Sequence, residues 1–409
     1  PYKFKVLFTL IVQNIRNFVK SLHKTSSFAK YSNKYFYFFS KLQLLIFMYQ
    51  YYSIEIMKTK KRISIYIAIS IIFTIIYLLF AAKPLAHEYQ FIPQWKISTL
   101  TPVTKNAGDY EKMYFKLGQT AGYFTETGDI THYNTFSSKI AISDYYYSTY
   151  ASDAKDLPFF DNQGKKLGTI EPAGYPFFIE NQIYVFLPGG CNFAKCNNDG
   201  SLNWKSQSTI PITAFNSNEN FCIVGYADGT IKVFNTNDGT CVMQNFPGGN
   251  ERPVILGVAI SDDGNYMASI SGHNTQRFVL AKIVNNKPKI IHHKFLNDEI
   301  YSQILIKFTD NNNSVLYNYN NNIGIYNISK DTTTTIPAKN KLISIEEADS
   351  IIYALGKDKN NYTVYVIEKT NTLIGTFSFN ADKAFIKTNK DYLYIGKDNS
   401  ISQILVTKK

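Results

Sequence analysis

Short strand-like segments recur along most of this chain, and their repeat constrains the fold more than any other feature. From about residue 110 onward, apolar or alternating runs of about five residues are separated by turns rich in Gly, Asn and Asp, and none resembles a long helix. The middle runs of successive units are centred 47, 47, 39 and 37 residues apart, near Ile231, Phe278, Ile325, Val364 and Ile401. A period of about 40–50 residues with several strands per unit predicts an all-β fold, the β-propeller.

The number of repeating units predicts how many blades the propeller has. Eight units begin near Tyr110, Tyr145, Phe177, Pro211, Val254, Tyr301, Leu342 and Ala384. We therefore predict eight four-stranded blades over residues 108–409, or seven if 110–176 forms one irregular unit.

The last unit has room for only three strands before the chain ends. A strand from the N-terminal side of the body can supply the missing outer strand and close the ring. Within residues 83–107, which we interpret as a linker, Gln94–Val103 is the candidate, with Trp95 as its ring-closing residue.

Several predicted turns contain an Asp-Gly pair, whose residues tolerate positive φ. These turn residues are Asp228, Gly229, Asp238, Gly239, Asp263 and Gly264. The segments that contain them, GYADGTIKVFNTNDGT (225–240) and AISDDGNYMASISG (259–272), resemble the repeats of WD40-type and quinoprotein-like propellers. Weaker similarity occurs at 125–134, 197–204, 320–327 and 397–405, while the Trp-Asp dipeptide of true WD40 repeats is absent.

The resemblance implies two functions. Quinoprotein-like propellers include dehydrogenases that hold a quinone cofactor and calcium in the central channel, whereas others are protein-binding platforms. The chain has two Trp, Trp95 and Trp204, and neither stands in a context that suggests a cofactor-stacking platform. We therefore expect a binding or scaffolding module with no cofactor, and keep a quinone-dependent oxidoreductase as the alternative.

The segment before the body has the features of a membrane anchor. Residues 57–62 (MKTKKR) are basic, and residues 63–82 contain no charge over 20 positions, enough for a helix to cross one hydrocarbon core. Basic residues stay on the cytoplasmic side, so residues after Lys83 are predicted to be extracytoplasmic. We expect a single-pass inner-membrane protein with a periplasmic propeller; cleavage after Ala86 is the alternative.

Residues 1–56 differ from the rest of the chain. They begin with Pro1 and are crowded with Phe, Tyr, Ile, Leu, Lys, Ser and Asn, without caps or a clean period. We interpret them as a non-native upstream extension, with Met57 as the native start. The competing interpretation is a genuine hydrophobic or membrane-surface segment, around Leu42–Tyr52.

Charge argues against a nucleic-acid partner. The net charge is +12, but residues 1–62 hold twelve basic residues and one acid, Glu55. The remaining residues are nearly neutral, so the body has no excess of positive charge with which to displace counterions from a phosphate backbone.

No catalytic or metal-ligating constellation is evident. Cys222 and Cys241 are predicted to lie two strands apart, too far for a disulfide, and Cys191 could pair with Cys196 only if 188–196 is a loop. His292 and His293 would point to opposite faces of a strand, and Asp262-Asp263 and Glu346-Glu347 resemble turn or edge residues. We expect a protein partner to dock on a face or rim where loops rich in Tyr and Asn lie, at Tyr145–Tyr150 and Tyr317–Asn322.

Overall fold

The computed structural model describes residues 60–81, 88–104, 110–151, 155–249, 251–273, 275–296 and 302–408. The chain divides into two compact units, Pro1–Leu85 and Ala86–Lys409. The predictions for residues 1–56 and for a start at Met57 lie outside the described residues.

In the first unit, the structure describes one helix, α3 (Lys60–Ala81). Its side chains are described over 66–77, where all of them are exposed, including Ile67, Ile72 and Ile76. No helix in the fully described part of the chain is both long enough and apolar enough to cross a membrane.

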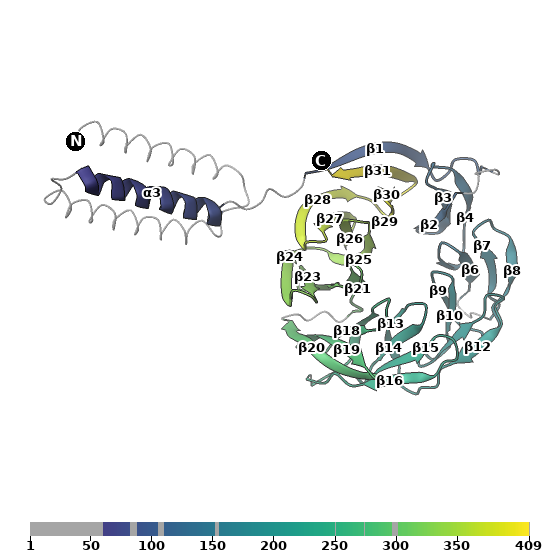
Figure 1. Cartoon of the computed structure of the whole chain (residues 1–409). Helices are drawn as coiled ribbons and strands as arrows, with labels where there is room; N and C mark the ends of the chain where they lie inside the picture. The colour runs from purple at the N-terminus through teal and green to yellow at the C-terminus, as the bar shows by residue number, and fades with distance from the viewer. Residues whose placement is uncertain are drawn as a thin grey trace. The chain divides into compact units, whose positions relative to one another are not determined.

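The second unit contains eight antiparallel sheets arranged around a centre (Figure 1). Blade 1 contains β2 (Lys112–Leu117), β3 (Thr120–Thr125) and β4 (Ile130–Thr135), and blade 2 contains β5 (Lys139–Ile142), β6 (Tyr146–Tyr150), β7 (Pro158–Asp161) and β8 (Lys166–Thr169). Blade 3 contains β9 (Tyr175–Ile179), β10 (Gln182–Phe186), β11 (Phe193–Cys196) and β12 (Leu202–Lys205). Blade 4 contains β13 (Ile212–Ser217), β14 (Phe221–Tyr226), β15 (Ile231–Asn235) and β16 (Cys241–Asn245).

The second half of the ring has the same organisation. Blade 5 contains β17 (Ile255–Ile260), β18 (Tyr266–Ser271), β19 (Gln276–Val284) and β20 (Lys287–Leu296), and blade 6 contains β21 (Ile306–Thr309), β22 (Ser314–Tyr319), β23 (Asn322–Asn327) and β24 (Thr332–Pro337). Blade 7 contains β25 (Lys341–Glu347), β26 (Ile351–Asp358), β27 (Asn361–Glu368) and β28 (Thr372–Asn380). Blade 8 contains β29 (Ala384–Asn389), β30 (Tyr392–Lys397), β31 (Ser400–Lys408) and β1 (Tyr89–Ser98). The predicted eight-bladed propeller is therefore confirmed, and the seven-bladed alternative is wrong.

Blade 8 is built from both ends of the body. β1 runs antiparallel to β31, from Tyr89 opposite Lys408 to Ser98 opposite Ser400, with a bulge between Pro93 and Trp95. This closing strand begins and ends five residues earlier than the segment Gln94–Val103. Trp95 lies within it, opposite Gln403.

Blade 1 departs from the pattern of the others. In the described residues it has three strands, and Thr104 donates a backbone hydrogen bond to Ile130 at the outer edge of β4. The unit start near Tyr145 is wrong, because residues 146–150 form the second strand of blade 2 and the inner strand is β5. β5 has only four residues, too few to show an alternating pattern.

The core lies between neighbouring blades, where the faces of the sheets pack together. The middle strands are covered on both faces, so most of their residues are apolar; every residue of β22 is buried. One cluster, for example, joins Phe278 and Leu280 of blade 5 with Val315 and Tyr317 of blade 6, and the rings of Phe278 and Tyr317 stack at 4.2 Å.

Aromatic side chains on outer strands contact glycine-containing turns of the next blade. The Trp204 indole donates to the Thr236 carbonyl at 2.9 Å, and a Cβ at Gly239 would lie 2.6 Å from its ring. Trp95 packs on Gly128 in the same way and donates to the Glu126 carbonyl at 3.2 Å. These turns need glycine both for positive φ, +72° at Gly239, and for the space under the ring.

We expect Gly239→Ala to lower the free energy of unfolding by about 2–4 kcal/mol, since it adds backbone strain and a clash with Trp204. Urea unfolding followed by tryptophan fluorescence measures the change. Gly375→Ala is the matched control, because no atom lies within 4 Å of its added Cβ, and it should change stability little. Equal effects of the two substitutions would contradict this account of the turn.

Candidate functional site

The turns that follow the inner strands gather on one side of the ring. We call them the belt turns: residues 143–145, 180–181, 218–220, 261–265, 310–313, 348–350 and 390–391, together with residues 110–111, which lead into β2. Since seven inner strands end at the belt and β2 begins there, β2 runs in the opposite sense. Three strands then carry the chain across blade 1 to the side where β5 begins.

Hydrogen bonds link the belt region of every blade to that of the next. In the first half of the ring they are Tyr114 N to Asp144 Oδ1 at 2.7 Å, Ser143 Oγ to Glu180 O at 2.8 Å, Gln182 Nε2 to Asn218 O at 3.0 Å and Asn218 Nδ2 to Ser261 O at 2.7 Å. In the second half they are Asp262 N to Asn312 Oδ1 at 3.0 Å, Asp310 N to Glu347 Oε1 at 2.8 Å, Thr388 Oγ1 to Glu347 O at 3.0 Å and Asn389 Nδ2 to Glu111 Oε2 at 3.3 Å. These bonds hold the eight turns in fixed positions relative to one another.

Each blade contributes at least one carboxylate to the belt turns. In blade order they are Glu111, Asp144, Glu180, Glu219, Asp262 with Asp263, Asp310, Asp349 and Asp391. Within the same turns the one basic residue is Lys390. The belt is therefore an acidic surface on a body that is almost neutral overall.

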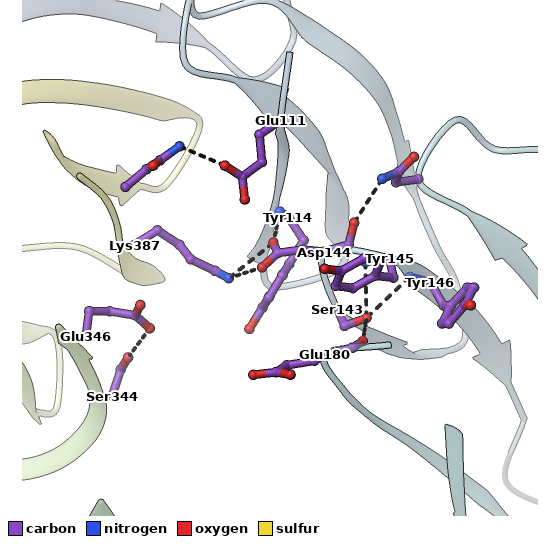
Figure 2. A network of polar contacts seen from close by, with 12 residues as sticks. Glu111, Tyr114, Ser143, Asp144, Tyr145, Tyr146, Glu180, Ser344, Glu346 and Lys387 are labelled. Carbon is purple, nitrogen blue, oxygen red and sulfur yellow. Dashed lines mark hydrogen bonds and ion pairs between the residues drawn. The ribbon is translucent and has the colours of Figure 1, made fainter. Parts of the chain in front are cut away.

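One lysine bridges blades 8 and 2 across blade 1 (Figure 2). The Lys387 Nζ of β29 lies 2.9 Å and 3.2 Å from the two Asp144 carboxylate oxygens, and 4.0 Å from the centre of the Tyr114 ring. Glu346, from blade 7, points toward the same space. The Lys387 side chain is 14% exposed, whereas the Asp144 side chain is 38% exposed.

Burial and charge act in opposite directions on this cluster. Burial lowers the pKa of Lys387, but Asp144, Tyr114 and Glu346 outweigh it and hold the pKa above its ordinary value. Burial raises the pKa of the Glu346 carboxyl, against the opposing effect of Lys307 and Lys387. Lys387 therefore remains charged and partly neutralises the carboxylates around it.

Two exposed tyrosines belong to the belt turns. Tyr145 is 52% exposed and stands next to Asp144, and Tyr110 is 46% exposed next to Glu111. The other expected surface tyrosines belong to strands: Tyr147 is buried in β6, and Tyr317 and Tyr319 are buried in β22. The prediction of a Tyr-rich loop at 317–322 was wrong, because only Asn320 and Asn321 form the turn.

The Asp-Gly pairs occupy three different kinds of turn. Asp263 and Gly264 lie in the belt, where Asp263 accepts hydrogen bonds from Ser261 and Asn265. Asp228 and Gly229 join β14 to β15, and Asp228 accepts from the Thr230 amide and hydroxyl, both at 2.9 Å. Asp238 and Gly239 join β15 to β16, and Asp238 accepts from the Thr240 amide. All three aspartates stabilise the local backbone.

The remaining candidate residues serve packing. Both Trp rings lie against glycine turns of the next blade. The four cysteines are free thiols; burial raises the pKa of Cys196 and of Cys222 to about 12. His292 stacks on Tyr326 at 4.1 Å while His293 is exposed, and the described residues contain no group of three side chains suited to a metal ion.

Sequence reasoning missed the belt. Its residues are common turn formers, and only their recurrence after each inner strand distinguishes them. Placing the repeats in register reveals an acid or Asn at this point in unit after unit, as at Asn218-Glu219, Ser261-Asp262 and Thr309-Asp310.

Comparisons with known proteins agree with the propeller architecture. A family described as "beta-propeller protein" matches residues 57–408. A protein of Treponema pallidum (strain Nichols), described as uncharacterized, is 24% identical over 360 residues, which cover 85% of this chain and 95% of that protein.

Solved structures share the fold at low sequence identity. BamB from Moraxella catarrhalis is 11% identical, with a TM-score of 0.54, covering 77% of this chain and 98% of BamB. Sqt1 from Saccharomyces cerevisiae is 12% identical, with a TM-score of 0.55, covering 78% of this chain and all of Sqt1. The designed protein Ika8 is 15% identical, with a TM-score of 0.55, covering 73% of this chain and 94% of Ika8.

We expect Lys387→Met to lower the free energy of unfolding by about 1–2 kcal/mol, because it leaves the Asp144 carboxylate without its ion-pair partner and the Glu346 carboxyl with Lys307 alone. The loss should shrink when Asp144→Asn is added, which a double-mutant cycle by urea unfolding measures. Additive effects of the two substitutions would show that the bridge does not couple the blades.

Proposed function

Since the chain belongs to a family of β-propeller proteins, we propose that it is a protein-docking module whose belt binds a basic surface of a partner protein. The observation that carries this proposal is the acid found in the belt turn of each blade, held in place by a closed series of hydrogen bonds. Carboxylates fixed around one surface give a field that attracts a partner of opposite charge and favours one orientation.

The belt supplies side chains that are free for a partner. Among the described residues, the carboxylates of Glu180, Glu219 and Asp262 take part in no hydrogen bond or ion pair, although their backbones belong to the belt. The exposed rings of Tyr110 and Tyr145 add the amphipathic contact area that protein interfaces favour. Little conformational entropy is lost on binding when a surface is already ordered.

We further propose that residues 63–82 anchor the protein in the inner membrane, with the propeller on the extracytoplasmic side. The uncharged run, the basic residues before it and the exposure of every described side chain of α3 support this proposal. An apolar helix surface without a polar face is stable in lipid rather than in water.

The anchor is tested by washing isolated membranes with high salt and then alkaline carbonate. We expect the full chain to remain in the membrane fraction. Ile72→Asp with Ile76→Asp should release it, since each acid near the centre of the span costs about 2.5–3.5 kcal/mol. Ile72→Leu with Ile76→Leu is the control that should behave as wild type. Extraction of the wild-type chain by carbonate would contradict the anchor.

Docking is tested by photo-crosslinking from position 145 in native membranes. We expect protein adducts whose yield falls about tenfold or more in the triple variant Glu180→Lys, Glu219→Lys, Asp262→Lys, and falls with added salt in the wild type. None of these side chains is used by the belt hydrogen bonds, so the fold should be preserved.

Charge reversal away from the belt provides the matched control. The control variant combines Asp156→Lys, Glu251→Lys and Asp358→Lys. It changes three exposed acids outside the belt turns and should leave the adduct yield unchanged. An equal yield from the belt variant and the wild type would overturn the docking proposal, whatever the result for the anchor.

A further inference from the structure

The outer edge of blade 5 combines a long strand, positive charge and exposed apolar surface. β20 has ten residues, as does β1 of blade 8, whereas the outer strands of the neighbouring blades, β16 and β24, have five and six. It pairs with β19 along its length, and no strand of the described chain pairs with its other side. Because Pro288 has no amide donor, the open backbone stretch is Lys289–Leu296.

Apolar side chains are exposed along this strand. Ile290 is 40% exposed, Ile291 39% and Phe295 50%, and Val284 at the end of β19 is 47% exposed. Ile291 is the extra residue of a bulge, since Leu280 pairs with His292 and Ala281 with Ile290. Lysines on an edge strand protect it from aggregation, but this protection does not require apolar side chains to be exposed. Exposed apolar surface of this kind is typical of an interaction site.

The hairpin of β19 and β20 is strongly basic. Residues 276–296 contain Arg277, Lys282, Lys287, Lys289 and Lys294, two histidines and no acid. None of the five basic side chains forms an ion pair with another described residue. A second copy of the same edge would bring like charges together, which disfavours self-pairing.

Side-chain contacts with neighbouring parts of the ring already hold the hairpin of β19 and β20 in place. His292 stacks on Tyr326 of blade 6 at 4.1 Å, and Lys294 lies over the Tyr319 ring, 5.3 Å from its centre. Arg277 donates to the carbonyls of Pro247 and Gly248 and lies 5.7 Å from the centre of the Phe295 ring. An added strand would therefore meet an ordered edge and lose little entropy to reorganisation.

We propose that β20 is a β-augmentation site, where an extended acidic segment of another polypeptide with alternating apolar residues adds as a fifth strand to blade 5. The backbone of Lys289–Leu296 supplies ladder hydrogen bonds, the isoleucines and Phe295 contact the apolar residues, and the lysines select acidic ones. This site is separate from the belt. Its proposed occupant is acidic, whereas the proposed partner of the belt is basic.

The test uses the full chain and a labelled ten-residue peptide of alternating Glu and Val. We expect saturable binding by fluorescence anisotropy, together with slower hydrogen exchange of amides within Lys289–Leu296. Lys287→Glu with Lys289→Glu should weaken binding about tenfold or more. The matched control, Lys165→Glu with Lys166→Glu at the short outer strand of blade 2, should bind as wild type.

A second peptide separates strand addition from charge attraction. It has the same sequence, with N-methyl groups on alternate residues that remove the ladder donors, and we expect it not to bind. Equal binding of the N-methylated peptide would overturn the proposal. The proposal would also be overturned if the unmodified peptide did not bind. It would likewise be overturned if anionic lipid vesicles, but not this peptide, slowed hydrogen exchange of the amides within Lys289–Leu296.

Discussion

The pairing of β1 with β31 is the interaction on which the rest of the propeller depends. It joins two strands from opposite ends of the body, from Tyr89 opposite Lys408 to Ser98 opposite Ser400, and so turns a row of sheets into a ring. Without it blade 8 would expose both an unpaired edge and an apolar face. The entropy cost of closing so long a loop grows only slowly with its length. The hydrogen bonds between β1 and β31, together with the packing of Trp95 in the cluster that contains Tyr394, can therefore offset it.

Ring closure brings the belt turns of all eight blades together. This arrangement orders the turns but also places like charges on one surface. The turns bring carboxylates from all eight blades to one surface, where they repel one another. Some are stabilised by backbone amides, as when Asp263 accepts from the Asn265 amide, and Asp144 is also stabilised by Lys387. Among the described residues, the carboxylates of Glu180, Glu219 and Asp262 have neither kind of support, so this repulsion is not offset at their positions.

The repeat was predictable because the middle strands are buried on both faces and therefore have long apolar runs. The residues used to measure the period, Ile231 and Phe278 among them, all lie in the third strand of a blade. The inner strand β5 was missed because it has four residues, and the belt because its bonds join distant segments. Lys387 stands 243 positions from Asp144, and an alternating strand gives no sign that one of its lysines faces a carboxylate.

Near-neutral net charge in the body hides a strong separation of charge. The belt turns hold an acid in every blade with only Lys390 among them, whereas residues 276–296 hold five basic residues and no acid. The Debye length at physiological ionic strength is about 8 Å, so exposed charges farther apart than this are largely screened from one another. Each surface therefore presents its own field to a partner, and the total charge of a propeller says little about what its individual blades attract.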